Sequence, residues 1–234
     1  MKYLISFLFL ALAFSMKSEA KATLPSILGD NMVLQQQAEV KLWGKARPNA
    51  TVTVKTSWNG QTYKFSSDGK GGWSLTVSTP VAGGPYKIIF NDGELLTLQN
   101  VLIGEVWFCS GQSNMEMPMG CFDRQPVRGA NDIIAKAKPS TPIRMYTTDS
   151  KDGRWVRQFS KTPAEDCQGE WLENTPVNVS HISAVSYYFA RYIQEVLEVP
   201  VGIVVSTWGG SRIEAWMSSL LVALIFPSSI TMLK

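Results

Sequence analysis

Short stretches of alternating apolar and polar residues fill the first hundred positions of the chain. Each stretch has the two-residue period of a strand with one buried face, and turn-forming residues separate them at intervals of roughly 8 to 12 positions. The predicted strands are Val40 to Trp43, Thr51 to Ser57, Gln61 to Phe65, Trp73 to Val77, Tyr86 to Phe90 and Leu95 to Leu98. Asn59-Gly60 and Asp92-Gly93 favour tight hairpins between neighbouring strands. The pattern therefore predicts a small all-β sandwich over residues 22–100.

The pattern changes after Val101, where continuous apolar runs replace strict alternation. Val106 to Cys109 and Val201 to Val205 are rich in β-branched or aromatic residues, which is typical of strands buried on both faces. The residues from Gly120 to Thr175 contain four prolines and few long apolar periods. We expect loops there, with one short helix over Ala130 to Lys138, walling a substrate cleft.

A helix is predicted just before the second apolar run. Apolar residues recur there at spacings of four, four and three, which places them on one helix face. They are Val185, Phe189, Ile193 and Val196. Ser183 is well placed as the N-cap, and Pro200 ends the helix. The chain from residue 101 is therefore expected to be an α/β unit, with no continuous sheet across residue 100.

A serine motif, Gly111-Gln112-Ser113-Asn114-Met115, directly follows the first apolar run. Ligands in open α/β sheets bind at the carboxyl ends of the strands, so Ser113 stands where a hydrolase places its nucleophile. Met115 occupies the position where the elbow of α/β-hydrolases needs glycine, which disfavours an ordinary α/β-hydrolase. Gly209-Gly210 follows the second run, and glycine lets backbone N–H groups approach a ligand closely. The N–H groups of Ser113 and of this turn are candidate donors to an oxyanion.

Two segments carry a resemblance to a known family. Gly104 to Glu116 resembles the first motif block of the sialate O-acetylesterases, which are SGNH hydrolases that remove acetyl groups from carbohydrates. Pro200 to Ser218 is similar to the second block, in which a Trp-Gly-Gly turn precedes Ile-Glu-Ala-Trp. The likeness runs from about Leu24 to Ser218. It implies an SGNH-type, flavodoxin-like three-layer α/β domain over residues 101–218 that is incomplete at its C-terminus.

The resemblance also implies the site and its substrate. Ser113 corresponds to the nucleophile, and Gly210 fits the glycine of the second block. Gly209, Asn114 and Gln112 are the further candidates for oxyanion or substrate binding. The implied reaction is removal of O-acetyl groups from sialic acid or a related sugar, and no cofactor is implied. Glu116 and Glu214 lie beside the motifs, where each either orients substrate or loop backbone or serves as a surface or capping residue.

The catalytic base is not assigned by the resemblance. The chain has one histidine, His181, which precedes the predicted helix and is interpreted as a capping or surface residue rather than a relocated base. The later family blocks, one with Gln-Gly-Glu and one with Asp-x-His, have no counterpart, and residues 219–234 form an aberrant apolar tail. We therefore expect an esterase chain truncated after the second block. An inactive remnant or a glycan-binding module is the alternative.

Residues 1–20 predict a secretory signal peptide. Lys2 supplies the basic region, Tyr3 to Phe14 is nearly all apolar, and Ser18-Glu19-Ala20 offers small residues for cleavage. A membrane anchor is the alternative, but the apolar stretch is shorter than the roughly 20 residues that a span needs. A secreted or periplasmic protein with no stable membrane span after cleavage is expected. The net charge of +3 over 234 residues gives no case for nucleic-acid binding.

The three cysteines cannot all pair within the chain. Cys109 lies in the apolar strand and is interpreted as a small buried hydrophobe. Cys121 and Cys167 either form a disulfide or, as we favour, remain free thiols. No Cys/His spacing indicates a metal site. Of four tryptophans that would suit stacking on sugar rings, Trp208 and Trp216 are expected at the cleft, and Trp155 and Trp171 in the core.

Overall fold

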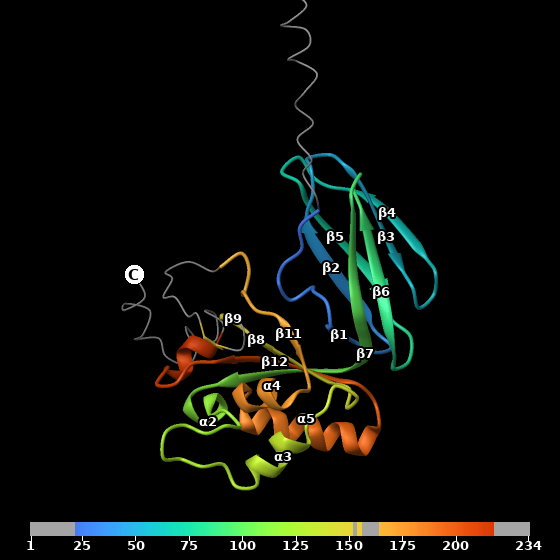
Figure 1. Cartoon of the computed structure of the whole chain (residues 1–234). Coiled ribbons are helices and arrows are strands. Elements are labelled where there is room, and N and C mark those ends of the chain that lie inside the picture. The colour runs from blue at the N-terminus through green and yellow to red at the C-terminus, as the bar shows by residue number, and fades with distance from the viewer. Residues whose placement is uncertain (1–21, 152–153, 156–163, 218–234) are drawn as a thin grey trace, which may run out of the picture.

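The computed structural model describes residues 22–151, 154–155 and 164–217. The predicted signal peptide over residues 1–20 and the tail over residues 219–234 lie outside the described residues, as does the side chain of Trp155. The described part is a mixed α/β fold dominated by a sheet (Figure 1).

The first hundred residues contain all six predicted strands. The strands of the structure are β1 (Val33–Gln35), β2 (Glu39–Lys45), β3 (Thr51–Thr56), β4 (Thr62–Ser66), β5 (Gly72–Ser78), β6 (Gly83–Asn91), β7 (Leu95–Gly111), β8 (Ile143–Thr147), β9 (Ser150–Lys151), β10 (Arg154–Trp155), β11 (Trp171–Glu173) and β12 (Val201–Thr207). The helices are α2 (Ser113–Glu116), α3 (Ala130–Lys136), α4 (Pro176–His181), α5 (Ala184–Leu197) and the 3-10 helix η1 (Ile213–Trp216).

Both predicted hairpins are present. β3 and β4 pair antiparallel across Asn59-Gly60, where Gly60 has a φ of 67°. The Asn59 side chain accepts hydrogen bonds from Thr56 Oγ1 at 2.6 Å and from the Gln61 amide at 2.9 Å, which closes this turn. β6 and β7 pair antiparallel across Asp92-Gly93, where φ of Gly93 is 116°. The local turn chemistry therefore fixed both connections.

β7 runs through the predicted boundary at residue 100 without a break. Its first part pairs antiparallel with β6, and residues 105–111 pair parallel with β12. Asn100 interrupts the regular extended backbone with a φ of 55° but does not end the strand. The expectation of no continuous sheet across residue 100 is wrong, because one strand supplies backbone hydrogen bonds to both parts of a sheet ordered β11-β8-β12-β7-β6-β3-β4.

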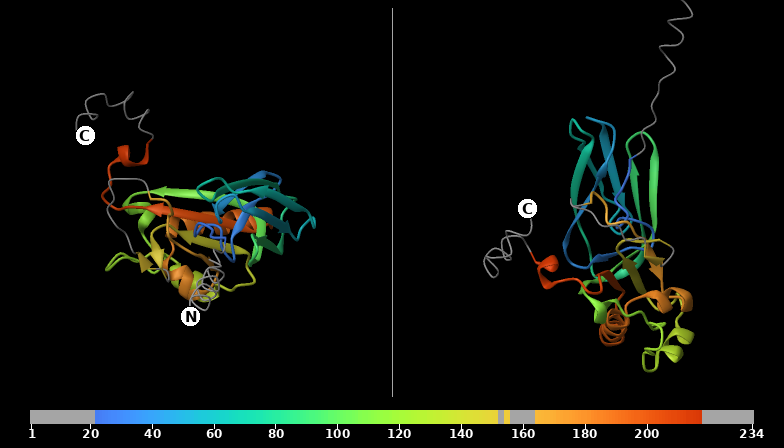
Figure 2. Two further views of the ribbon diagram at one scale, coloured as in Figure 1. Left: turned by 90° about the horizontal axis from the view of Figure 1, so that it is seen from above. Right: turned by 90° about the vertical axis from the view of Figure 1, so that its left-hand side faces the viewer.

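The parallel strands have the spatial order β8-β12-β7. The first strand of the α/β part thus lies beside the third, whereas the flavodoxin-like order places the first strand between the second and third. The helices α3, α4 and α5 lie on one side of these strands, and the N-terminal β strands lie on the other (Figures 1 and 2). Among the described residues, α3, α4 and α5 therefore cover one face of these strands, and the three-layer arrangement stays a prediction.

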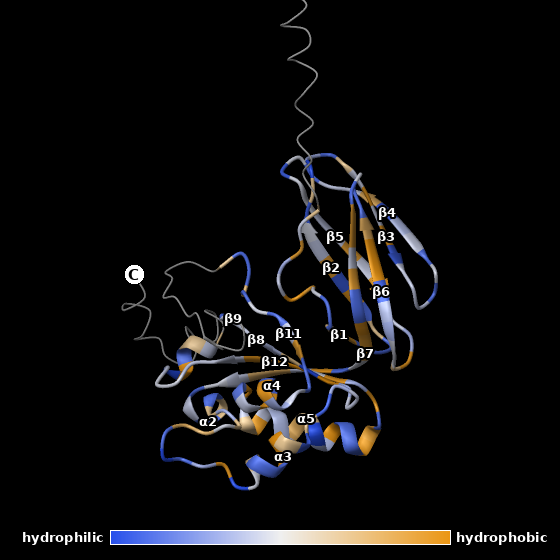
Figure 3. Cartoon of the chain, viewed as in Figure 1, coloured by the Kyte–Doolittle hydropathy of each residue, from blue (hydrophilic) through white to orange (hydrophobic). Residues whose placement is uncertain are grey.

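Two apolar clusters fill the two faces of this sheet. On the helix side, Cys109, Met145 and Ile203 pack with residues of α4 and α5. On the opposite side, Tyr146 and Val204 join the cluster that contains the interior of the N-terminal β strands. Apolar residues follow β6, β7 and β12 in Figure 3. The N-terminal strands therefore cover the face that a second helical layer covers in other α/β folds.

The buried face of α5 differs from the predicted one. Ser183 caps the helix as expected, and its side chain accepts a hydrogen bond from the Ser186 amide. The buried helix residues are Ala184, Ser186, Tyr187 and Ala190. Of the predicted face, Val185, Phe189 and Val196 are 42%, 37% and 59% exposed. Three of these four buried residues are small, which allows close packing of the helix against the sheet.

The strand β8 was missed by the sequence prediction, which expected loops between residues 120 and 175. Its first four residues are fully buried between β11 and β12, although one of them is Arg144. Burial lowers the pKa of Arg144, and the nearby Glu173 carboxylate opposes that effect. The sequence did not indicate a strand here, because the charged Arg144 interrupts the apolar residues that follow Pro142. Arg144 can be buried because it forms an ion pair with Glu173 on β11.

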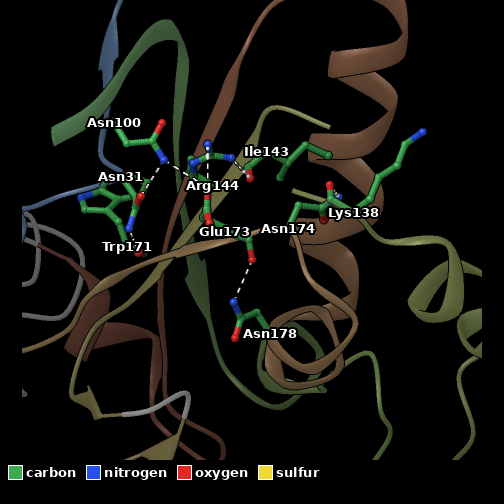
Figure 4. Close-up of polar contacts among 9 residues, drawn as sticks. All are labelled: Asn31, Asn100, Lys138, Ile143, Arg144, Trp171, Glu173, Asn174 and Asn178. Atoms are coloured by element: carbon green, nitrogen blue, oxygen red, sulfur yellow. Dashed lines mark hydrogen bonds and ion pairs between the residues drawn. The ribbon is translucent and has the colours of Figure 1, made fainter. Parts of the chain in front are cut away.

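A polar network around Arg144 joins the N-terminal β strands to the α/β part (Figure 4). Arg144 Nη2 lies 3.2 Å from Glu173 Oε1, which also accepts a hydrogen bond of 3.1 Å from the Asn100 side chain. Asn100 donates to Asn31 Oδ1 at 2.7 Å, and Asn31 donates to the carbonyl of Trp171 at 3.4 Å. The network thus connects β7, β8, β11 and the loop before β1.

Substitutions on the two faces of α5 should have different effects. Replacing Ala190 by leucine is expected to lower the free energy of unfolding by about 1–3 kcal/mol, because it overpacks the contact between the helix and the sheet. Tyr192 is exposed and lies two turns after Val185, on the predicted face, so replacing it by lysine is expected to change this free energy by less than about 0.5 kcal/mol. Urea denaturation followed by circular dichroism measures both. A larger loss for Tyr192→Lys would show that the predicted face is the buried one.

The cysteines should differ in thiol reactivity. All three are free in the structure, with Cys109 buried and Cys121 exposed. Burial raises the pKa of Cys109, and a hydrogen bond with Ser186 opposes this only in part. Cys121 should therefore react rapidly with Ellman's reagent, and Cys109 only after unfolding, because the thiolate is the reactive form. Fewer than three titratable thiols in unfolded, unreduced protein would indicate a disulfide instead.

Candidate functional site

Ser113 lies at the carboxyl end of β7, as the sequence predicted. Gly111 ends the strand, and Ser113 begins the single turn of α2, whose Glu116 amide donates to the Gln112 carbonyl at 2.9 Å. Ser113 is exposed, and so are its neighbours Gln112 and Asn114. The motif therefore presents its polar side chains to solvent at the end of a buried strand.

The structure gives a reason for methionine at the position where α/β-hydrolases have glycine. Gly111 has a φ of 150°, and a Cβ atom on it would lie 2.9 Å from Met115 Cγ. The side chain of Met115 thus packs directly on the Gly111 backbone. The glycine required for clearance precedes the serine here, whereas in the elbow motif a further glycine follows it.

The Gly209-Gly210 turn lies beside Ser113. Thr207 at the end of β12 pairs with Gly111, and the Trp208 amide continues the ladder with a 3.0 Å hydrogen bond to the Gly111 carbonyl. A Cβ atom on Gly209 would lie 3.4 Å from Ser113 Oγ. The serine hydroxyl therefore faces the turn, and the structure brings together the two motifs that the sequence predicted at adjacent strand ends.

The two glycines of the turn meet different requirements. At Gly209 space is limited, since a Cβ atom there would lie 3.1 Å from Glu116 Oε2 and 3.4 Å from Ser113 Oγ. Gly210 has open space beside its Cα but a φ of 74°, which side chains rarely adopt. The Ser211 side chain donates to the Trp208 carbonyl at 2.6 Å and closes the turn. The positive φ therefore favours glycine at position 210, and the neighbouring side chains favour glycine at position 209.

Glu116 contacts the turn directly. Its Oε2 accepts a hydrogen bond from the Gly209 amide. Of the two roles left open for this residue, orienting loop backbone is the one that the structure shows. Glu214, on η1, has no side-chain hydrogen bond or ion pair among the described residues. Sequence reasoning could not separate the two glutamates, because both lie close to a motif.

Of the tryptophans given a role by the sequence analysis, Trp171, Trp208 and Trp216 have described side chains, and the core assignment of Trp171 is confirmed. The indole of Trp171 is 5% exposed and donates to the Ile27 carbonyl at 2.8 Å, so it belongs to the core. Trp216 is 36% exposed and donates to Ser211 Oγ at 2.8 Å, which places it against the glycine turn. Trp208 is half-buried at the start of that turn.

His181 is an exposed residue at the end of α4. It caps neither neighbouring helix, since the side chains of Thr175 and Ser183 are the N-caps of α4 and α5. In the part of the chain that the structure describes, His181 forms no side-chain hydrogen bond or ion pair. The structure therefore supports the interpretation as a surface residue. Nor do residues 22–151, 154–155 and 164–217 contain a cluster of His, Cys, Asp or Glu that would hold a metal ion.

The fold of the chain is similar to that of a solved carbohydrate esterase. The chain superposes on the solved structure of a carbohydrate acetylesterase from Xanthomonas citri with a TM-score of 0.77 and 33% sequence identity, covering 89% of this chain and 45% of that one. No protein-family model matches the chain.

Curated relatives carry a more specific name. The sialate O-acetylesterases of Pongo abelii and Homo sapiens are each 29% identical over 211 residues, which are 82% of this chain and 38% of each relative. That of Rattus norvegicus is 30% identical over 208 residues and 37% of its length. The predicted resemblance is confirmed, and the chain is a relative of the sialate O-acetylesterases. It spans less than two fifths of the length of these relatives.

Substitutions in the turn should separate the two glycine requirements. Gly210→Ala is expected to lower the free energy of unfolding by about 1–2 kcal/mol, because the left-handed conformation strains a side chain. Gly210→Asn should cost less, since asparagine tolerates that conformation. Gly209→Asn should be no more stable than Gly209→Ala, because at this position the neighbouring side chains, and not the backbone conformation, restrict a larger residue. Thermal unfolding measures these differences, and Gly69→Ala, with open space and no positive φ, is the neutral control. Equal losses for the alanine and asparagine variants of Gly210 would contradict this account.

Proposed function

We propose that the chain carries a serine-dependent acetylesterase site that removes O-acetyl groups from sialic acid or a related sugar. The observation that carries the proposal is the approach of Ser113 Oγ to the Gly209 turn at the ends of adjacent parallel strands. The names of the solved and curated relatives support a carbohydrate esterase. They do not favour the alternative of an inactive remnant or a glycan-binding module.

Ser113 is the nucleophile in this proposal. Its Oγ forms a bond to the acetyl carbonyl carbon, and the bond from that carbon to the sugar oxygen then breaks. The serine proton passes to a base and from there to the departing sugar oxygen, and water later releases acetate from the acyl-enzyme. The amides of Ser113 and Gly210 are the proposed oxyanion donors. Gln112 and Asn114, exposed on either side of the serine, are proposed to bind the sugar.

The base is the part of this mechanism that the described site does not contain. His181 is the one histidine of the chain, and it lies at the surface end of α4. A serine without its base retains only the rate that the oxyanion donors and substrate binding provide. We therefore propose that the 234-residue chain hydrolyses acetyl esters slowly, and that Ser113→Ala changes this slow rate only slightly.

An SGNH-type α/β domain preceded by an all-β sandwich is proposed for the architecture. The core supports the sandwich, because Leu42 and Val77 of the β2–β5 pair share one apolar cluster with Val52 and Phe90 of the larger sheet. The serine at the carboxyl end of β7 supports the SGNH assignment. Since β7 is common to both parts, the boundary between them falls within this strand.

Export to the periplasm or the medium is also proposed, on the pattern of residues 1–20. Among the helices of the described chain, none is long and apolar enough to cross a membrane.

An added base tests the role of Ser113. Imidazole supplied in solution should replace the missing base and raise acetate release from O-acetylated sialic acid by at least about tenfold in the wild-type chain. Ser113→Ala should show no increase beyond the rate of imidazole alone, which a protein-free reaction gives. Ser110→Ala, altered near the end of β7 just before the motif, is the matched control and should behave as wild type.

Two results would contradict the proposal. Imidazole stimulation that survives in Ser113→Ala would remove Ser113 as the nucleophile. Rapid turnover without imidazole that is lost in both Ser113→Ala and His181→Ala would identify His181 as the base.

A further inference from the structure

Glu116 occupies a particular place beside the nucleophile. It follows Ser113 by three residues on α2, so both side chains project from the same side of the turn. Its Oε2 and Ser113 Oγ both lie within 3.4 Å of the point where a Cβ atom of Gly209 would be. The same Oε2 accepts the hydrogen bond from the Gly209 amide. The carboxylate and the hydroxyl therefore flank one backbone atom of the turn.

This contact decides which amide of the turn remains for substrate. The Gly209 N–H is occupied by the carboxylate, and hydrogen bonds to a charged acceptor are stronger than those between neutral groups. Among the described residues, the Gly210 N–H has no hydrogen-bond acceptor. Gly210 is exposed, and its positive φ turns the backbone sharply just after the fixed Gly209.

We propose that Glu116 is a positioning residue, which fixes Gly209 and thereby holds the Gly210 N–H toward the oxyanion that forms at Ser113. This inference rests on the proposed esterase function. Oxyanion donors act by being held in place before the reaction, so a donor on a loose turn loses much of its effect. In this proposal Glu116 holds the Gly209 amide and does not take the serine proton.

The first readout needs no turnover. In ¹H–¹⁵N spectra of the labelled chain, the Gly209 amide proton should resonate downfield because its acceptor is a carboxylate. Glu116→Ala should move this resonance upfield and speed its hydrogen exchange by at least about tenfold. In Glu116→Gln, which keeps an acceptor oxygen without the charge, the Gly209 resonance should lie between its positions in wild type and in Glu116→Ala. Glu214→Gln, which removes a neighbouring charge from η1, should leave the Gly209 resonance in place.

The second readout is imidazole-stimulated acetate release. Glu116→Ala should lower kcat by at least about tenfold with little change in KM, because a donor that acts in the transition state is misplaced while substrate binding remains. Glu116→Gln should recover part of the loss, and Glu214→Gln should match wild type. Circular dichroism and thermal unfolding confirm that each variant is folded.

The outcomes separate this inference from the proposed function. If the Gly209 amide resonance and its exchange rate are unchanged in folded Glu116→Ala, the positioning role is overturned. It is also overturned if the loss of activity in Glu116→Ala appears in KM alone, or if Glu214→Gln loses as much activity. If imidazole-stimulated release by the wild-type chain does not depend on Ser113, the proposed esterase function fails. The Gly209 amide resonance then tests the positioning role by itself. An upfield shift in Glu116→Ala supports the contact between Glu116 and the turn, and an unchanged resonance overturns it.

Discussion

The structure depends on the backbone hydrogen bonding of one strand, β7. Its N-terminal part pairs with β6, its middle with β1, and residues 105–111 with β12. The N-terminal β strands and the α/β part therefore share a continuous hydrogen-bonded ladder, and a flexible linker does not separate them. The Arg144 network crosses the same junction through Asn100, which lies within β7. Because Ser113 follows this strand directly, the nucleophile position is fixed by the same ladder.

The ladder also explains how two distant motifs meet. The β7–β12 pairing places Gly111 opposite Thr207, so the residues that follow each strand emerge at the same edge of the sheet. Close packing then sets the details, since Met115 lies on the Gly111 backbone and Gly209 lies against Ser113 and Glu116. The Gly209 amide, which donates to the Glu116 carboxylate, therefore lies directly beside the serine hydroxyl.

Much of the fold followed from local pattern. The Asn59-Gly60 and Asp92-Gly93 turns, the strands that they connect and the Ser183 cap all result from contacts within a few residues, which a sequence displays directly. The buried face of α5 was predicted wrongly, because the helix carries apolar residues on more than one face. The strand β8 was not predicted, because its buried Arg144 is stabilised by Glu173, a partner from another strand.

The sequence by itself determined the strand periods, the turns and the two motifs with their serine and glycines, since each is encoded by neighbouring residues. Tertiary structure alone decided that β7 continues across residue 100, which face of α5 is buried, and that Glu116 rather than Glu214 holds the glycine turn. These outcomes depend on distances between segments far apart in the chain. Hydrogen bonding and close packing between such segments are collective properties of the folded molecule, and no local pattern of residues specifies them.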